Sequence, residues 1–265
     1  MKPDQILKQA KNPKHIPGIY NYCDRWCERC NFTSRCLNYD IRSIREKDLK
    51  KHDLNNSEFW EELMGIFEST LQLIKQLAAE EGMDLSLTEK VEVEKEIKKG
   101  RDAREKAMKH PIFRDAKIYI KIVDEFFEEE KDPFEKMENE MNSQLRMGMN
   151  EKKIRTEVNE IKDISEIINW YNPQIWVKLM RALTGKFANE RKHDDHSFPS
   201  DSDGSAKVAL VGIDRSMAAW GRWQLLFPEK TDDLITILLH LDKLRKQVEL
   251  FFPKARSFTR PGFDD

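Results

Sequence analysis

The chain has 265 residues, of which 39% belong to the hydrophobic set and 35% are charged, and its formal net charge is −2. This length is enough to bury a sizeable core, and the near-neutral charge excludes a global basic field that would draw the molecule to nucleic acid or to a membrane. Ten glycines and ten prolines are few for this length, so turn-forming residues are scarce. That scarcity favours long helices over a many-stranded sandwich, barrel or Rossmann sheet.

The first segment lacks the apolar core of a signal peptide, and no apolar run is long enough to span a bilayer. We therefore expect a cytoplasmic protein that does not associate with membranes. The thiol pool of that compartment is kept reduced, so closely spaced cysteines indicate metal ligands rather than disulfides.

Charge and cysteine content divide the chain into two predicted domains. Residues 1–51 contain twelve Lys or Arg and six Asp or Glu, a net charge of +6, which leaves −8 for the rest. All four cysteines lie between Cys23 and Cys36. We predict a basic four-cysteine metal-binding module over residues 1–52 and a helical body over residues 53–265.

Helices are predicted throughout the chain. An amphipathic stretch over residues 37–49 follows the cysteines, and apolar residues recur at helical spacing over residues 59–77 before Gly82, a natural helix stop. A second helix start at Ser86 leads to a helix that we expect to end at Gly100.

Pro111 marks the boundary before the next predicted helix. Pro173 should kink or divide a later one, while residues 134–153 are either a helix or a linker and residues 185–204 form the longest predicted loop. No period-2 pattern is sustained anywhere, so the predicted fold is an all-α helical bundle. Its later helices are expected over residues 112–130, 156–183, 206–226 and 232–252.

The cysteines carry the strongest motif, C-x3-C-x2-C-x5-C. Four thiols within 14 residues can supply a tetrahedral set of sulfur donors with short loops between the ligands. Such a module has little core of its own, so metal binding would supply much of its folding energy. Aromatic neighbours could shield the sulfurs from water, and arginines could offset thiolate charge and donate hydrogen bonds to sulfur. The ligands are Cys23, Cys27, Cys30 and Cys36, the aromatic residues are Tyr22, Trp26, Phe32 and Tyr39, and the arginines are Arg25, Arg29 and Arg35.

The spacing favours a [4Fe–4S] cluster, with zinc as the alternative. Zinc sites more often use two separated C-x2–4-C pairs, whereas one continuous run with an x5 gap is common in cluster-binding sequences. Residues Cys27–Cys36 also resemble the C-x2-C-x5-C signature, with an aromatic after the middle cysteine, of iron–sulfur-stapled DNA-repair and CRISPR-associated nucleases. In those families another cysteine lies far from the motif in the sequence, whereas here Cys23 lies four residues before Cys27. Their α/β nuclease core has no counterpart in this strand-poor chain. The resemblance therefore implies a cluster and not nuclease activity.

Two narrower cysteine motifs are present within the run. Cys23-x3-Cys27-x2-Cys30 has the spacing of the radical S-adenosylmethionine enzymes, but Cys36 is available for the fourth iron and no β/α barrel is predicted. Cys27-x2-Cys30 has the spacing of a redox pair, but thioredoxin-type chemistry expects a βαβ neighbourhood.

Other polar clusters have simpler interpretations. Residues His193–His196 (HDDH) offer imidazoles and carboxylates for a metal but lie in a polar, Ser/Asp-rich stretch. Residues Asp201–Gly204 resemble the middle of a calcium loop, yet Pro199 and Leu210 would occupy its first and twelfth positions. We instead expect Asp203 or Ser205 to cap the following helix.

Polar and aromatic residues within the predicted helices allow two interpretations. Buried ion pairs and a packed core are the simpler one, and a substrate pocket or a ligand-stacking surface is the alternative. The polar set includes Lys178, Arg181, Asp214 and His240, and the aromatic set is Trp170, Tyr171, Trp176, Trp220 and Trp223.

Three functions follow from these predictions, and no catalytic residue set is identified. The preferred hypothesis is a cluster-binding protein in which the cluster is structural or senses redox state, acting through contacts with another protein. The second is an oxidoreductase or electron carrier whose substrate binds among the polar helical residues. The third is a zinc-stabilised adaptor that touches nucleic acid through the arginines of the module and the basic stretch Arg42–Lys51.

Overall fold

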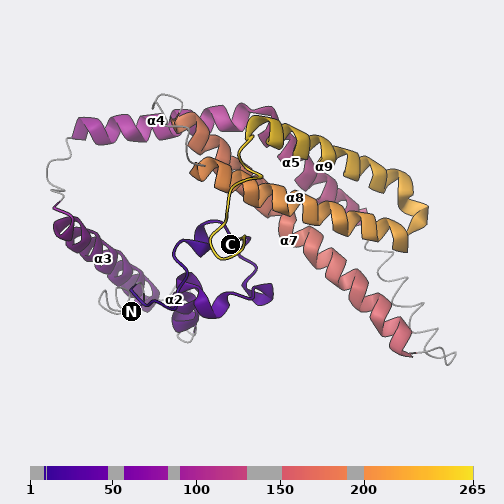
Figure 1. Ribbon diagram of the computed structural model, residues 1–265, viewed down its shortest axis with the longest axis horizontal. Helices are drawn as coiled ribbons and strands as arrows, with labels where there is room; N and C mark the ends of the chain where they lie inside the picture. The colour runs from indigo at the N-terminus through magenta and orange to yellow at the C-terminus, as the bar shows by residue number, and fades with distance from the viewer. Residues whose placement is uncertain are drawn as a thin grey trace. The chain divides into compact units, whose positions relative to one another are not determined.

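The computed structural model describes residue 9 and residues 11–46, 57–82, 90–129, 151–189 and 200–264. All regular structure within these ranges is helical (Figure 1), so the all-α prediction is confirmed there. None of the helices in these ranges combines the length and apolar character needed to cross a bilayer.

Short 3₁₀ helices surround the cysteines, and longer α-helices follow them. The 3₁₀ helices near the N-terminus are η1 (Ile19–Asn21), η2 (Cys27–Arg29) and η3 (Thr33–Arg35). The first α-helices are α2 (Leu37–Glu46), α3 (Ser57–Glu80) and α4 (Lys90–Lys109). The later elements are α5 (Pro111–Glu129), α7 (Glu151–Asn189), α8 (Asp201–Leu226), η6 (Pro228–Lys230) and α9 (Thr231–Phe251).

The chain forms two compact units. One comprises Met1–Lys98 together with Thr259–Asp265, and the other comprises Lys99–Phe258. The predicted boundary between residues 52 and 53 lies outside the described residues and stays a prediction.

The second unit is a bundle of α5, α7, α8 and α9, which lie side by side in Figure 1. Its most extensive interface joins α7 to α8, while α5 packs on α7 and α9. The α7–α8 approach is close, because a Cβ at Gly212 would lie 3.1 Å from Cγ1 of Ile175 and 3.2 Å from Cδ1 of Tyr171. Glycine at this position therefore lets the side chains of Ile175 and Tyr171 pack closely against the backbone of α8.

Aromatic side chains form the centre of this bundle. Trp220 is fully buried and its indole Nε1–H donates a hydrogen bond to the hydroxyl oxygen of Tyr119 at 3.0 Å. Phe126 meets Trp220 and Trp223 edge to face, with ring centroids 4.8 and 5.6 Å away. Tyr171 is also buried. The core interpretation of these aromatic residues is thus confirmed at Tyr171, Trp220 and Trp223.

Several predicted helix ends are wrong. Gly100 lies inside α4, since a single glycine costs a helix only about 1 kcal/mol. Pro173 lies inside α7 and does not divide it, and this helix continues to Asn189, well into the predicted loop. Its neighbours Tyr171 and Ile175 are buried in the core, and this packing opposes the loss of one backbone hydrogen bond. The region around Ser86 lies outside the described residues.

The predicted cap of α8 is correct in part, because Asp203 takes part in the cap but is not the N-cap residue. Ser200 is the N-cap, and its Oγ accepts a hydrogen bond from the backbone N–H of Asp203 at 3.2 Å. The Asp203 carboxylate in turn accepts one from the backbone N–H of Ser200 at 3.1 Å. This reciprocal capping box places Asp203 and Ser205 inside the helix, which excludes the calcium-loop reading of Asp201–Gly204.

A buried carboxylate connects α5 to α9. Asp115 is 5% exposed, and its carboxylate lies 3.0 Å from Nζ of Lys243 and accepts a hydrogen bond from Nε2 of Gln247, also at 3.0 Å. His240 donates from Nε2 to the Asp115 backbone carbonyl at 2.8 Å. Burial alone would raise the pKa of Asp115, but the hydrogen bonds from Lys243 and Gln247 outweigh it and lower the pKa.

The substitution Leu241→Ala should lower the free energy of unfolding by about 2–5 kcal/mol, because it leaves a cavity where a fully buried side chain lay. Leu239 on the same helix is 65% exposed, so Leu239→Ala is the matched control and should change stability by less than about 0.5 kcal/mol. Urea denaturation followed by circular dichroism measures both. Equal losses would contradict the assignment of the buried face of α9.

The substitution Asp115→Asn should lower stability at neutral pH by about 1–3 kcal/mol. Because the folded-state pKa lies below the ordinary value of 3.8, the ionised form stabilises the fold above that pH and the contribution is lost as the pH falls through the lower pKa. The difference between the parent protein and the variant should therefore shrink on acidification. A difference that stays constant from pH 7 to acid would contradict the role of the carboxylate charge.

Candidate metal centre

All four cysteines line one cavity in the first unit. Cys23, Cys27, Cys30 and Cys36 contribute to the wall of a pocket that is partly open to solvent. Each of the four is a free thiol of intermediate exposure. The structure therefore brings together all of the predicted ligands, although they come from different turns of the chain.

Tight turns hold the cysteines in place. Cys27 begins η2 and its carbonyl accepts the backbone N–H of Cys30 at 3.2 Å, while the carbonyl of Thr33 accepts that of Cys36, also at 3.2 Å. Before these turns, Arg25 has a left-handed backbone with φ of 59°, and the Asp24 carboxylate accepts the N–H of Trp26 at 3.1 Å. The sequence between the cysteines is thus folded by local hydrogen bonds rather than by a core.

The C-terminal tail completes the wall of the cavity. Phe263 lines it and meets Phe32 edge to face, with ring centroids 5.1 Å apart. The neighbouring Gly262 has φ of 77°, and a Cβ there would lie 2.8 Å from Cδ1 of Ile16 and 3.0 Å from Cδ1 of Ile19. The tail therefore packs closely on the cysteine module, in a conformation that favours glycine.

The predicted aromatic wall is largely present. Trp26, Phe32 and Tyr39 line the cavity as expected. Tyr20 and Phe263 also line it, and sequence reasoning missed both. Phe263 belongs to a tail at the far end of the chain, and no local pattern links it to the cysteines.

The sulfur atoms have polar contacts to the backbone. The backbone N–H of Phe32 donates to Sγ of Cys30 at 3.4 Å, and the Cys23 thiol donates to the carbonyl of Tyr20 at 3.6 Å. N–H donation to a cysteine sulfur stabilises negative charge on it, as the thiolate form requires.

Ionisation of the Cys27 thiol is unfavourable in this cavity. Burial raises the pKa of the Cys27 thiol above its usual range, and the neighbouring Cys23 raises it further, against the opposing charge of Arg42. A metal centre in this cavity would reverse the balance, because a coordinating cation holds the thiol in its deprotonated form.

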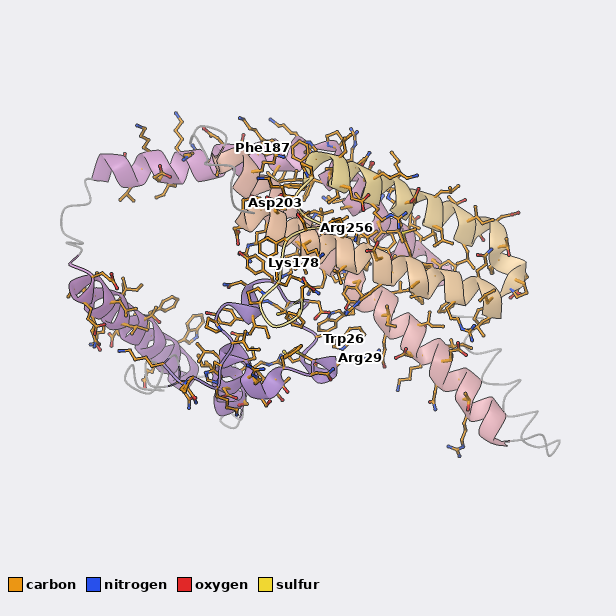
Figure 2. All side chains as sticks on the ribbon, viewed as in Figure 1. Trp26, Arg29, Lys178, Phe187, Asp203 and Arg256 are labelled. Carbon is orange, nitrogen blue, oxygen red and sulfur yellow. The ribbon has the colours of Figure 1, made fainter. Side chains whose placement is uncertain are left out.

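The three arginines have different positions. Arg25 lines the cavity beside the cysteines. Arg29 stacks on the indole of Trp26, with its guanidinium carbon 4.1 Å from the ring centroid, and Figure 2 shows the pair together in the module. The side chain of Arg35 is exposed, while its backbone carbonyl accepts the N–H of Ile16 at 3.0 Å. Of the three predicted arginines, Arg25 is therefore the one that lines the cavity.

A buried histidine fastens the segment before the cysteines. His15 is 8% exposed, and its Nδ1 lies 2.9 Å from the carbonyl of Gln9 and its Nε2 lies 2.8 Å from Oδ2 of Asp40. This contact connects the segment before the cysteines to α2. Sequence reasoning missed it, because Asp40 follows His15 by 25 residues and neither residue belongs to a recognisable motif.

The sulfur atoms share a cavity without meeting at one point. Within the described ranges, no three His, Cys, Asp or Glu side chains converge closely enough to hold a single metal ion. Tetrahedral zinc with sulfur ligands at about 2.3 Å requires neighbouring sulfurs about 3.8 Å apart. In a four-iron cluster each thiolate binds a different iron, so the sulfurs stand further apart.

The polar helical residues do not form a common site. Arg181 pairs with Asp201 at 2.7 Å, Asp214 pairs with Arg256 at 2.5 Å, and His240 binds the backbone of α5. Lys178 is buried in α7. The Arg181–Asp201 pair joins α7 to α8, but the side chains of both ion pairs are 38–55% exposed, so the prediction of buried ion pairs is wrong for them. The HDDH stretch at residues 193–196 lies outside the described residues.

Comparison with known proteins gives no assignment. No protein-family model matches the chain. No curated protein and no solved structure matches it either.

The substitution Cys30→Ser should disorder the module while most of the helical signal remains, because the long helices of the second unit have their own apolar core. Limited proteolysis should cut residues 11–46 faster, and far-ultraviolet circular dichroism should change little. Ser34→Ala, at an exposed position between the last two cysteines, is the control and should leave both measurements unchanged. Global unfolding of the Cys30 variant would contradict the independence of the two units.

Proposed function

We propose that the module holds a [4Fe–4S] cluster through Cys23, Cys27, Cys30 and Cys36, and that the cluster is structural or redox-sensing in a protein that acts by contacting another protein. The observation that carries the proposal is the shared cavity lined by all four thiols. When bound, the cluster would supply cross-linking of the ligand run and a one-electron redox centre. The chain's own residues would hold and shield it.

The composition and spacing of the donor set favour a cluster over zinc. The donor set is all sulfur and comes from one continuous run, which suits a cluster with one thiolate on each iron. Zinc remains the alternative that metal analysis must test.

A structural role follows from how little apolar material the module buries. Among residues 11–43, Ile19 and His15 are the buried side chains, and the 3₁₀ helices η2 and η3 bury none. A segment with so small a core depends on its ligand for folding energy. A cluster bound here would therefore determine whether the module is ordered.

A redox-sensing role is compatible with the exposure of the site. The cysteines are neither fully buried nor fully exposed, and the cavity is partly open to solvent. Oxidants can therefore reach these sulfurs. Loss of the cluster would then disorder the module and change the surface that a partner contacts.

Protein purified without oxygen should be brown and contain four iron and four sulfide per chain, because each of the four cysteines supplies one iron ligand. Cys36→Ser should lose the cluster rapidly, since Cys36 fills the fourth position. A colourless protein with one zinc would overturn the proposal. A Cys36 variant with an intact cluster would instead assign the three remaining cysteines to the radical S-adenosylmethionine type and also overturn it.

A further inference from the structure

Helix α3 exposes a row of large apolar side chains. Met64, Phe67, Leu71 and Ile74 are each between 48% and 59% exposed, and we call these four residues the α3 seam. Trp60 continues the same spacing toward the N-terminus and is 51% exposed. No helix in the described part of the chain shares an extensive interface with α3.

The spacing of the seam is that of a coiled coil. From Trp60 onward, its members follow one another at intervals of four, three, four and three residues. An alternation of three and four has an average period of 3.5, which keeps an apolar row facing a partner helix. Met64 and Leu71 then occupy a positions, and Phe67 and Ile74 occupy d positions. Leu77, which is 42% exposed, lies beside this row at a flanking g position.

We propose that α3 pairs with α3 of a second copy of this chain in an antiparallel two-stranded coiled coil. Antiparallel pairing places a positions opposite d positions, and one register does this along the whole seam. Met64 lies opposite Ile74 of the second copy, and Phe67 lies opposite Leu71 of the second copy, on both sides of a twofold axis. The seam is therefore complementary to itself, as a symmetric interface requires.

The flanking charges select this orientation. Glu61 and Lys75 occupy e positions. In the antiparallel register Glu61 of each copy lies beside Lys75 of the other copy, which makes two ion pairs. Both residues are exposed. In a parallel pairing Lys75 would adjoin Thr70, and no flanking pair would join opposite charges. Glu68 lies near the twofold axis and faces Glu68 of the second copy, which makes a single repulsive contact.

The proposal is independent of the metal centre and is tested on the full chain by sedimentation equilibrium over a range of concentrations. The parent protein should dimerise, and Phe67→Glu should weaken the dimer at least about 100-fold by burying a charge in the seam. Leu250→Glu alters an apolar residue that is 86% exposed on α9, and it should leave the dimer unchanged.

Charge exchange tests the register without altering the seam. Glu61→Lys and Lys75→Glu should each weaken the dimer about three- to tenfold, and the double variant should recover the parent affinity to within about twofold. The two residues lie 14 positions apart on one helix, about 21 Å, so they cannot compensate within one chain. Glu68→Gln should strengthen the dimer by removing the repulsion at the axis.

Three results would overturn the proposal. One is a protein that stays monomeric at about 100 μM, where even a weak coiled coil associates. Another is a monomer that loses helix on Phe67→Glu, which would mean that the seam packs on its own chain. The third is a double charge variant as weak as the single ones, which would exclude the antiparallel register.

Discussion

The placement of four cysteine thiols around one cavity is the constraint on which the first unit depends. Local 3₁₀ turns bring the cysteines together, and almost nothing else in the segment is buried. Burial and the neighbouring Cys23 raise the pKa of the Cys27 thiol. A metal centre here would supply the compensating positive charge. The proposed cluster would therefore account for the order of the module and for the position of this thiol.

The two units are stabilised by different means. The bundle of α5, α7, α8 and α9 has an aromatic core and a buried carboxylate between α5 and α9, so it resembles an ordinary helical domain. The first unit instead relies on its turns, the His15–Asp40 contact and the packing of the C-terminal tail. Phe263 lines the same cavity as the cysteines, although it lies far from them in the sequence.

Features with a local cause could be predicted from the sequence. The all-α fold followed from scarce turn residues and helical periodicity, and the cysteine cluster followed from spacing alone. Features set by packing could not. Helix α7 continues through Pro173 because Tyr171 and Ile175 beside it are buried, and Gly100 does not end α4. His15 and Phe263 join the site through contacts distant in sequence, and the periodicity of α3 predicted a helix without revealing that its apolar side is exposed.

X-ray absorption at the iron edge of anaerobically prepared protein tests the central claim most directly. The account predicts iron surrounded by four sulfurs, with further iron atoms in the next shell, and the loss of that second shell when any of the four cysteines is replaced. Absorption at the zinc edge instead, with four sulfurs at about 2.3 Å and no metal neighbour, would contradict it.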